Sequence, residues 1–122
     1  MKIALLGYGK MGKTIEKIAI ERGHEIVLKI SKDIHEHDLS IADVAIDFSV
    51  PDAAFENITS CFKSNVPVIS GTTGWLEKYD EAVEMCNEKG GSFLYASNFS
   101  IGVNLFFELN RNLAKLISPF DE

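Results

Sequence analysis

The sequence predicts an α/β fold, a doubly wound parallel sheet of about five strands with flanking helices in one domain. Three observations support this prediction. Short β-rich runs alternate with stretches of helical period along the whole chain. Glycines follow several of these runs, where tight turns are needed. The composition, 46% hydrophobic and 25% charged over 122 residues, is typical of one globular domain, here residues 1–122.

The first βαβ unit is predicted at the N-terminus. Lys2–Leu6 is an apolar run of strand length that ends at Gly7. Apolar residues then recur at spacings of three and four over residues 11–22, as in an amphipathic helix. Gly23 favours the end of that helix. Glu25–Ser31, which contains aliphatic and β-branched residues, is the second predicted strand.

The middle of the chain departs once from this alternation. Lys32–Asp43 is too short and too polar for a crossover helix, so we expect a loop or a single helical turn. Val44–Asp47 is the third strand, and Pro51 suits the first turn of a helix. That helix carries apolar residues on one side, namely Ala54, Ile58, Cys61 and Phe62. Val66–Ser70 is the fourth strand.

The last third contains two helices and a strand. Residues 76–86 have helical spacing, and Gly90-Gly91 closes the helix. Trp75 precedes it and is expected to anchor its packing. Ser92–Tyr95 is the fifth strand, and Val103–Ile117 is the final helix. Its apolar residues span an arc of roughly 200°, wider than packing on one sheet face requires. We therefore expect part of this helix, around Phe106, Phe107 or Leu113, to stay exposed in the chain.

Charge and cysteine content exclude several classes of protein. The net charge of −6 and pI near 5.0 disfavour nucleic acid as a partner, and no apolar run is long enough to cross a membrane. Cys61 and Cys86 lack metal-ligand spacing, so reduced, half-buried thiols in a cytoplasmic protein are expected, with a disulfide in a small secreted fold as the alternative. His35 and His37 are expected to be exposed, and no metal is predicted.

A six-residue glycine motif follows the first strand: Gly7, Tyr8, Gly9, Lys10, Met11 and Gly12. Gly7 permits a tight turn, Gly9 lets the backbone approach a pyrophosphate, and Gly12 allows a helix to pack closely on a strand. The helix N-terminus that follows favours anions. The motif therefore predicts a Rossmann-type domain that binds a dinucleotide, although a glycine-rich turn without a ligand is the simpler alternative.

The residues at the end of the second predicted strand bear on the choice of dinucleotide. An acidic residue there would hold the adenosine ribose hydroxyls and repel a 2′-phosphate. Ser31 and Lys32 stand there instead, and Lys32 could offset a phosphate charge, which favours NADPH at least as much as NADH. Asp33 could still reach a ribose, and a solvated polar turn remains an alternative.

Polar loops follow three other predicted strands. They are Asp47-Phe48-Ser49, Gly71-Thr72-Thr73-Gly74 and Ser97-Asn98-Phe99-Ser100. The carboxyl ends of parallel strands meet at one sheet edge, where open α/β sheets bind ligands, so we expect these loops to share a site. No nucleophile–base pair and no general acid is evident beside them, so no catalytic residue is predicted in this chain.

In order and spacing, the glycine motif, these loops and the run Ala96–Asn104 resemble the dihydrodipicolinate reductase family. The resemblance implies that residues 7–12 hold the cofactor pyrophosphate and that Ser31-Lys32 lie at the adenosine ribose. It also implies that Gly71, Thr72 and Thr73 contact the nicotinamide ribose side, and that the nicotinamide pocket is lined by Ala96, Ser97, Asn98 and Phe99. Phe48 and Ser49 are assigned to the same cofactor site.

The resemblance further implies NADPH or NADH as cofactor, a cyclic imine dicarboxylate of the diaminopimelate route to lysine as substrate, and a homotetramer. The family's substrate segment, which holds paired histidines and a lysine, has no counterpart in these 122 residues. We therefore expect this chain to be a cofactor domain that is inactive alone. Alternatives are the cofactor domain of an aspartate or homoserine type dehydrogenase, or a non-catalytic nucleotide-sensing module.

Overall fold

The computed structural model describes residues 1–120. Its centre is a five-stranded sheet in the order β2-β1-β3-β4-β5, and every neighbouring pair is parallel. The strands are β1 (Lys2–Leu6), β2 (Glu25–Ile30), β3 (Val44–Asp47), β4 (Val68–Ser70) and β5 (Phe93–Tyr95). The α/β prediction is confirmed. β2 lies on one side of β1 and the later strands on the other, so the order in which strands are added reverses between β1 and β3, which makes this place the switch point of the sheet.

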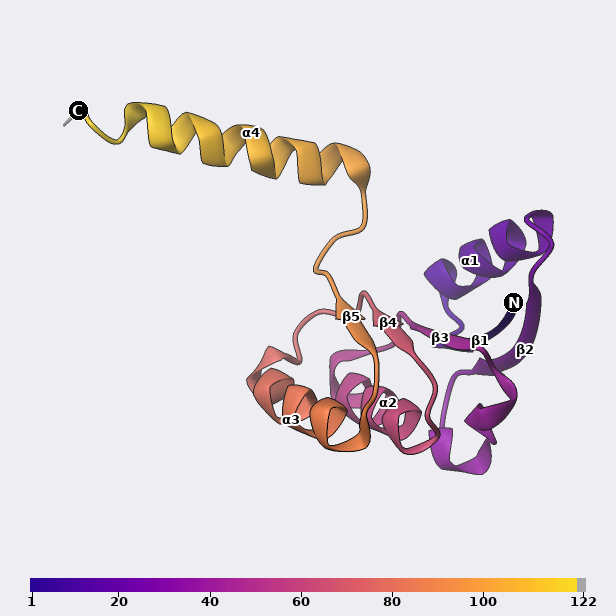
Figure 1. Cartoon of the computed structure of the whole chain (residues 1–122). Coiled ribbons are helices and arrows are strands. Elements are labelled where there is room, and N and C mark those ends of the chain that lie inside the picture. The colour runs from indigo at the N-terminus through magenta and orange to yellow at the C-terminus, as the bar shows by residue number, and fades with distance from the viewer. Residues whose placement is uncertain (121–122) are drawn as a thin grey trace.

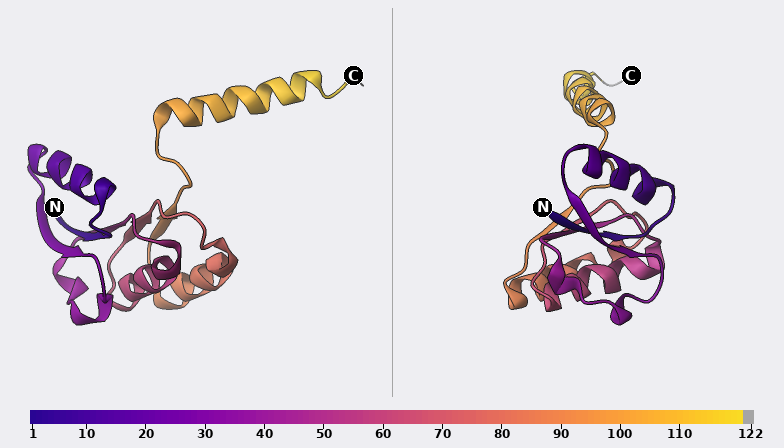
Figure 2. Two further views of the ribbon diagram at one scale, coloured as in Figure 1. Left: turned by 180° about the vertical axis from the view of Figure 1, so that it is seen from behind. Right: turned by 90° about the vertical axis from the view of Figure 1, so that its right-hand side faces the viewer.

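Helices lie on both faces of the sheet (Figures 1 and 2). α1 (Lys10–Glu21) covers one face, and α2 (Pro51–Lys63) and α3 (Tyr79–Lys89) cover the other. The alternation along β1 matches these layers. Ile3 and Leu5 pack with Ala19 of α1, whereas Ala4 and Leu6 belong to the larger cluster on the α2 side.

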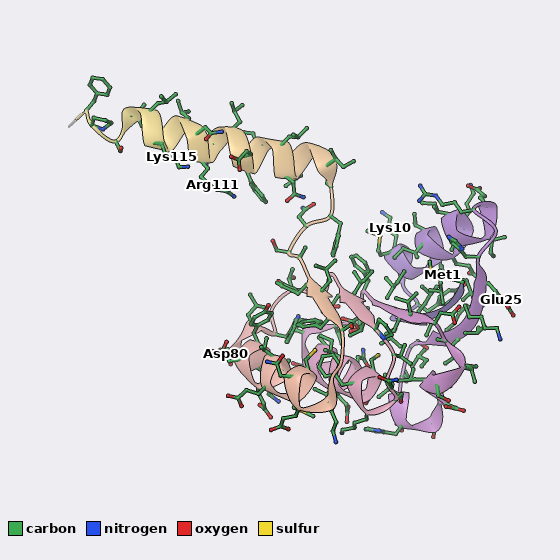
Figure 3. The ribbon with its side chains drawn as sticks, in the orientation of Figure 1. Met1, Lys10, Glu25, Asp80, Arg111 and Lys115 are labelled. Atoms are coloured by element: carbon green, nitrogen blue, oxygen red, sulfur yellow. The ribbon has the colours of Figure 1, made fainter. Side chains whose placement is uncertain are left out.

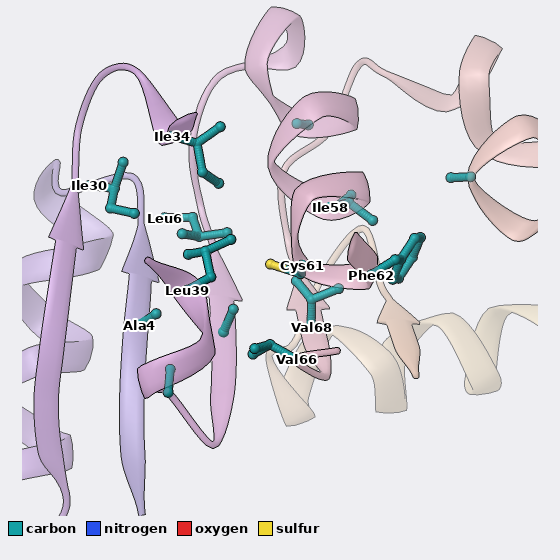
Figure 4. Packing of buried hydrophobic residues seen from close by; sticks show 14 of the residues in the cluster. Ala4, Leu6, Ile30, Ile34, Leu39, Ile58, Cys61, Phe62, Val66 and Val68 are labelled. Atoms are coloured by element: carbon teal, nitrogen blue, oxygen red, sulfur yellow. The ribbon is translucent and has the colours of Figure 1, made fainter. Parts of the chain in front are cut away.

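The larger core cluster lies between the sheet and α2 (Figure 4). Ile58, Cys61 and Phe62 of α2 are at most 2% exposed, so the predicted apolar side of this helix is confirmed. Each fully buried leucine or isoleucine contributes about 1.5–3 kcal/mol relative to an exposed one. Cys86 is half-buried and Cys61 is fully buried, deeper than expected, and both thiols are free.

The polar stretch after β2 forms two one-turn 3₁₀ helices, Ile34–Glu36 and Leu39–Ile41. Ile34 and Leu39 belong to the hydrophobic core, so this mostly polar connection is anchored to the domain by two buried side chains. Trp75 is 4% exposed, and its indole Nε1 donates to the Thr72 carbonyl at 2.8 Å. Its predicted role as a packing anchor is confirmed.

Several element ends differ from the prediction. Ser31 and Ser92 lie outside β2 and β5, and β4 begins at Val68. A 3₁₀ turn, Leu76–Lys78, precedes α3. The final helix, α4, spans Ile101–Ile117, because the Ser100 side chain caps it by accepting from the backbone N–H of Val103.

α4 stands away from the rest of the domain (Figures 1 and 3). None of its residues is buried. The predicted exposure at Phe106, Phe107 and Leu113 is confirmed. The other apolar side chains of the helix are exposed as well, apart from Val103, which is half-buried. The expectation that only part of the apolar arc would be uncovered is therefore wrong, since residues 96–100 carry the chain away from the sheet before the helix begins. Among residues 1–120, no helix is both long and apolar enough to cross a membrane.

Candidate functional site

The candidate site is a set of three hollows at the carboxyl edge of the sheet, beside the switch point where β1 and β3 are neighbours. One has a volume of about 390 Å³ and lies between the glycine loop, the turn after β2 and the start of α2. A second, of about 630 Å³, lies between α1, β3, β4 and residues 97–100. A third, of about 260 Å³, borders the loop after β4. Phe48 lines all three and so joins them into one site.

The glycine loop is packed so tightly that two of its glycines are required. Gly7 has φ +92°, and a Cβ there would collide with the Phe48 carbonyl. A Cβ at Gly12 would collide with the Gly7 carbonyl, so α1 can approach the loop only without a side chain at this position. Gly9 differs, because a Cβ there would meet no atom within 4 Å. Its backbone therefore faces the open space of the first hollow.

The N-terminus of α1 is not satisfied by its own side chains. The N-cap residue is Gly9, no side chain caps the helix, and no acidic residue lies in the first turn. The first backbone N–H groups of α1 therefore lack an intrahelical acceptor, and the positive end of the helix dipole lies beside Gly9. This arrangement can accept an anionic group.

A polar cluster, not predicted from the sequence, fixes the side chain of Tyr8. The Tyr8 hydroxyl donates to the Glu16 carboxylate, and Lys29 Nζ lies 3.0 Å from Glu16 Oε1 and 5.1 Å from the Tyr8 ring centroid. The hydrogen bond from Tyr8 and that from Lys29 lower the pKa of Glu16, and hydrogen bonding to Glu16 raises the pKa of Tyr8 and that of Lys29. The spacing Glu16 to Lys29 gives no sequence signal for this cluster.

The turn after β2 forms the outer wall of the first hollow. Ser31, Lys32 and Asp33 are exposed and line it. Within residues 1–120, Lys32 forms no salt bridge. His35 Nε2 lies 2.6 Å from Glu56 Oε1, and Glu56 also lines this hollow.

The second hollow is mainly apolar. Met11, Phe48, Ile69 and Phe99 contribute to its wall, and the rings of Phe48 and Phe99 meet edge to face with centroids 6.1 Å apart. Asn98 Oδ1 accepts from the Ser100 backbone N–H at 2.8 Å, which holds this loop in a turn. The hollow suits a flat ring with few polar atoms.

The structure brings most of the predicted site residues together. The following line one or more of the hollows: Gly7, Tyr8, Gly9, Met11, Ser31, Lys32, Phe48, Ser49, Gly71, Thr72, Thr73, Ser97, Asn98 and Phe99. Lys10, Gly12 and Ala96 line none of the three. Gly12 instead shapes the loop from below, and the Ala96 backbone N–H pairs with the Ser70 carbonyl at 3.2 Å.

Two predicted hydroxyls point into the protein. Thr72 Oγ1 donates to Asp47 and accepts from the Ser49 backbone N–H, both at 2.8 Å. Ser49 Oγ donates to Asp47 at 2.7 Å. The buried carboxylate of Asp47 is thus a central part of the site, although the sequence predicted Asp47 only as the end of the third strand and the start of a polar loop.

Comparison with known proteins identifies relatives over the whole chain. Residues 24–99 match the family described as dihydrodipicolinate reductase, N-terminus. A 4-hydroxy-tetrahydrodipicolinate reductase from Christiangramia forsetii is 58% identical over 100% of this chain and 52% of its own length. The enzyme of the same name from Thermosipho africanus is 36% identical over 99% of this chain and 55% of its length. The chain thus spans about half the length of the curated relatives it matches.

Solved structures share the fold at low identity. Homoserine dehydrogenase from Thermoplasma acidophilum superposes with a TM-score of 0.63 and 14% identity, over 78% of this chain and 42% of that one. Homoserine dehydrogenase from S. aureus gives a TM-score of 0.58 and 19% identity, over 78% and 32%. These similarities confirm the dehydrogenase-like architecture alone, so the homoserine-type alternative has weaker support than the reductase.

Proposed function

The chain belongs to the dihydrodipicolinate reductase family, and we propose that it forms the NAD(P)H-binding domain of a 4-hydroxy-tetrahydrodipicolinate reductase. In such an enzyme the reduced nicotinamide dinucleotide supplies a hydride to a cyclic imine dicarboxylate. The observation that carries the proposal is the meeting of three hollows at Phe48, beside the glycine loop and at the switch point where β1 and β3 are neighbours. The anionic, polar and apolar parts of a dinucleotide match the polarity of the surfaces at this place.

The pyrophosphate fits beside Gly9. The open backbone there and the unsatisfied N–H groups of α1 supply hydrogen-bond donors and a favourable dipole. Gly7 and Gly12 allow this surface to form, because the backbone packs so closely around both that a side chain at either position would collide with it. The residues present therefore fit the anionic centre of a dinucleotide.

The two ends of the dinucleotide are assigned by polarity. The hollow lined by Ser31 and Lys32 is proposed to hold the adenosine ribose, with Lys32 available for a 2′-phosphate. The apolar hollow between Phe48, Phe99 and Met11 is proposed to hold the nicotinamide ring and to limit its contact with water. Thr73, which is exposed, and the backbone of Gly71 border the path between them.

The remaining functions of the enzyme are proposed to lie in the half of the relatives that this chain does not match. These are the groups that bind the two carboxylates, the proton donor and the contacts of a tetramer. Residues 1–122 then bind and orient the cofactor and give no turnover without those groups. We place the enzyme in the cytoplasm, because free thiols such as Cys61 and Cys86 persist in a reducing compartment.

Titration with NADPH and NADH tests the proposal, with binding followed by the fluorescence of the reduced nicotinamide. We expect saturable binding of both. Replacing Lys32 with Ala should weaken NADPH by about three- to thirtyfold through loss of one charge-assisted contact, and leave NADH unchanged. Lys89→Ala, an exposed lysine on α3 outside the hollows, is the matched control. No binding of either nucleotide by the unmodified chain would refute the proposed function, and equal losses for both would refute the role of Lys32.

A further inference from the structure

Asp47 is a fully buried carboxylate at the end of β3, and no basic side chain pairs with it within the described part of the chain. Burying a charge without compensation is strongly unfavourable, so the hydrogen bonds of this carboxylate decide whether it is tolerated. It accepts four. They come from Ser49 Oγ at 2.7 Å, Asn57 Nδ2 at 3.1 Å, Ser70 Oγ at 2.8 Å and Thr72 Oγ1 at 2.8 Å.

The direction of these bonds is determined by a second set of donors. Ser49 Oγ accepts from Asn57 Nδ2 at 3.1 Å, and Thr72 Oγ1 accepts from the Ser49 backbone N–H at 2.8 Å. Ser70 Oγ accepts from the Thr72 backbone N–H at 3.4 Å. Each hydroxyl therefore accepts one hydrogen bond and donates its own hydrogen to the carboxylate. An ionised carboxylate, which accepts about four bonds and donates none, matches this network.

The four donors come from separate parts of the site. Ser49 follows β3, Ser70 ends β4, Thr72 lies in the loop after β4, and Asn57 belongs to α2. Two backbone bonds reinforce the connection, since the Gly71 N–H donates to the Asp47 carbonyl and the Phe48 N–H to the Leu6 carbonyl, both at 2.9 Å. Asp47 thus connects the loop after β3, which carries Phe48, to the loop after β4.

The fit between these loops leaves little freedom. A Cβ at Gly71 would overlap the Phe48 ring, so the ring lies directly against the backbone of the loop after β4. A small shift of either loop would displace Phe48, which lines every hollow of the site. Loops held in place before binding do not have to be ordered by the ligand, which improves affinity.

We propose that Asp47 is a positioning residue of the dinucleotide site. Its carboxylate contacts no hollow and acts through Ser49, Ser70 and Thr72, holding both loops at the spacing that keeps Phe48 between the adenosine and nicotinamide ends. This inference rests on the proposed function of the site.

Three variants test it. Asp47→Asn keeps the size of the side chain but places an N–H group against donors. Ser70→Ala removes a fully buried hydroxyl that lines no hollow, so any effect on binding is indirect and acts through its partners in the network, Asp47 and the Thr72 backbone N–H. Ser60→Ala, a buried serine on α2 outside the network, is the matched control.

Two readouts separate positioning from general destabilisation. NADPH affinity is measured by titration, and the emission of Trp75, the single tryptophan, reports on the loop whose Thr72 carbonyl it contacts. We expect Asp47→Asn to weaken NADPH at least about tenfold and Ser70→Ala about threefold, with shifted Trp75 emission and helical circular dichroism retained. Ser60→Ala should match the unmodified chain in both.

The outcomes distinguish this proposal from the proposed function. Absence of NADPH binding in the unmodified chain refutes the proposed function and, with it, the positioning role. Normal binding by the unmodified chain together with unchanged affinity in Ser70→Ala and Asp47→Asn refutes the positioning role alone. If Asp47→Asn does not fold, the comparison of Ser70→Ala with Ser60→Ala decides. Equal losses in those two serine variants would also overturn the proposal, because the effect would then not depend on Asp47.

Discussion

Gly9 and Gly12 belong to one motif, yet the structure predicts opposite consequences of adding a methyl group to each. Gly12 lies inside α1, where alanine favours the helix by about 1 kcal/mol over glycine. Its Cβ, however, would collide with the backbone carbonyl of Gly7, which cannot rotate away as a flexible side chain would. Overpacking of this kind costs about 1–3 kcal/mol, so Gly12→Ala should lower the free energy of unfolding by about 1 kcal/mol.

Gly9→Ala should leave the unfolding free energy within about 0.5 kcal/mol of the unmodified chain. The φ of Gly9 is −86°, which alanine adopts without strain, and its Cβ would meet no protein atom within 4 Å. The methyl group would instead enter the hollow proposed for the pyrophosphate. We expect the NADPH dissociation constant to rise at least about tenfold, or about 1.4 kcal/mol.

Urea unfolding and NADPH titration of the same preparations separate the two effects. Gly102→Ala is the control, since its Cβ would meet only Ser100 Oγ at 3.9 Å and lies outside the hollows. Gly102→Ala should bind NADPH normally and lose no stability. If Gly9→Ala bound NADPH as tightly as the unmodified chain, the placement of the pyrophosphate beside Gly9 would be wrong. If Gly12→Ala were as stable as the unmodified chain, the loop would be more adaptable than its contacts indicate.

Three further predictions concern other parts of the chain. Burial raises the pKa of the Cys61 thiol to about 12, so Ellman's reagent should label only Cys86 in the folded protein. Because folding raises this thiol pKa, the free energy of unfolding should also fall as the pH rises from about 9 toward 12. Folding lowers the pKa of Glu16, so its contribution to stability is lost as the pH falls below 4.5, and Glu16→Gln should unfold in acid with a shallower pH dependence. Phe106 and Leu113 are 63% and 52% exposed on α4, so the chain is expected to self-associate through this helix, and the double variant Phe106→Ser with Leu113→Ser should do so less in sedimentation velocity.

The strand and helix pattern could be predicted because it depends on local residue spacing. β1 and β3 have the predicted bounds, and the other strands differ only at their ends. Buried parallel strands are short apolar runs, and the glycines that end α1 and α3 have positive φ, at Gly23 and Gly90. The convergence of the polar loops followed from topology, because carboxyl ends of parallel strands share one edge.

The direction of polar side chains could not be predicted in the same way. Thr72 and Thr73 are adjacent and chemically alike, but one is buried and the other exposed. The difference in burial comes from Asp47, which is distant in sequence and accepts a hydrogen bond from the hydroxyl of Thr72. The Tyr8–Glu16–Lys29 cluster is equally non-local, since it depends on how α1 lies against β2. Such contacts are set by packing, for which spacing along one chain gives no signal.

Loss of affinity alone does not assign a residue in this site to ligand contact. Gly9 and Lys32 face the hollows, so their replacement should alter binding at constant stability. Gly12 and Asp47 do not line a hollow, and their replacement should alter stability, loop geometry and binding together. The two groups meet at Phe48, whose carbonyl limits the glycine loop and whose ring limits the loop after β4. A ligand contact is therefore identified by an affinity change that leaves both the unfolding free energy and the Trp75 emission unaltered.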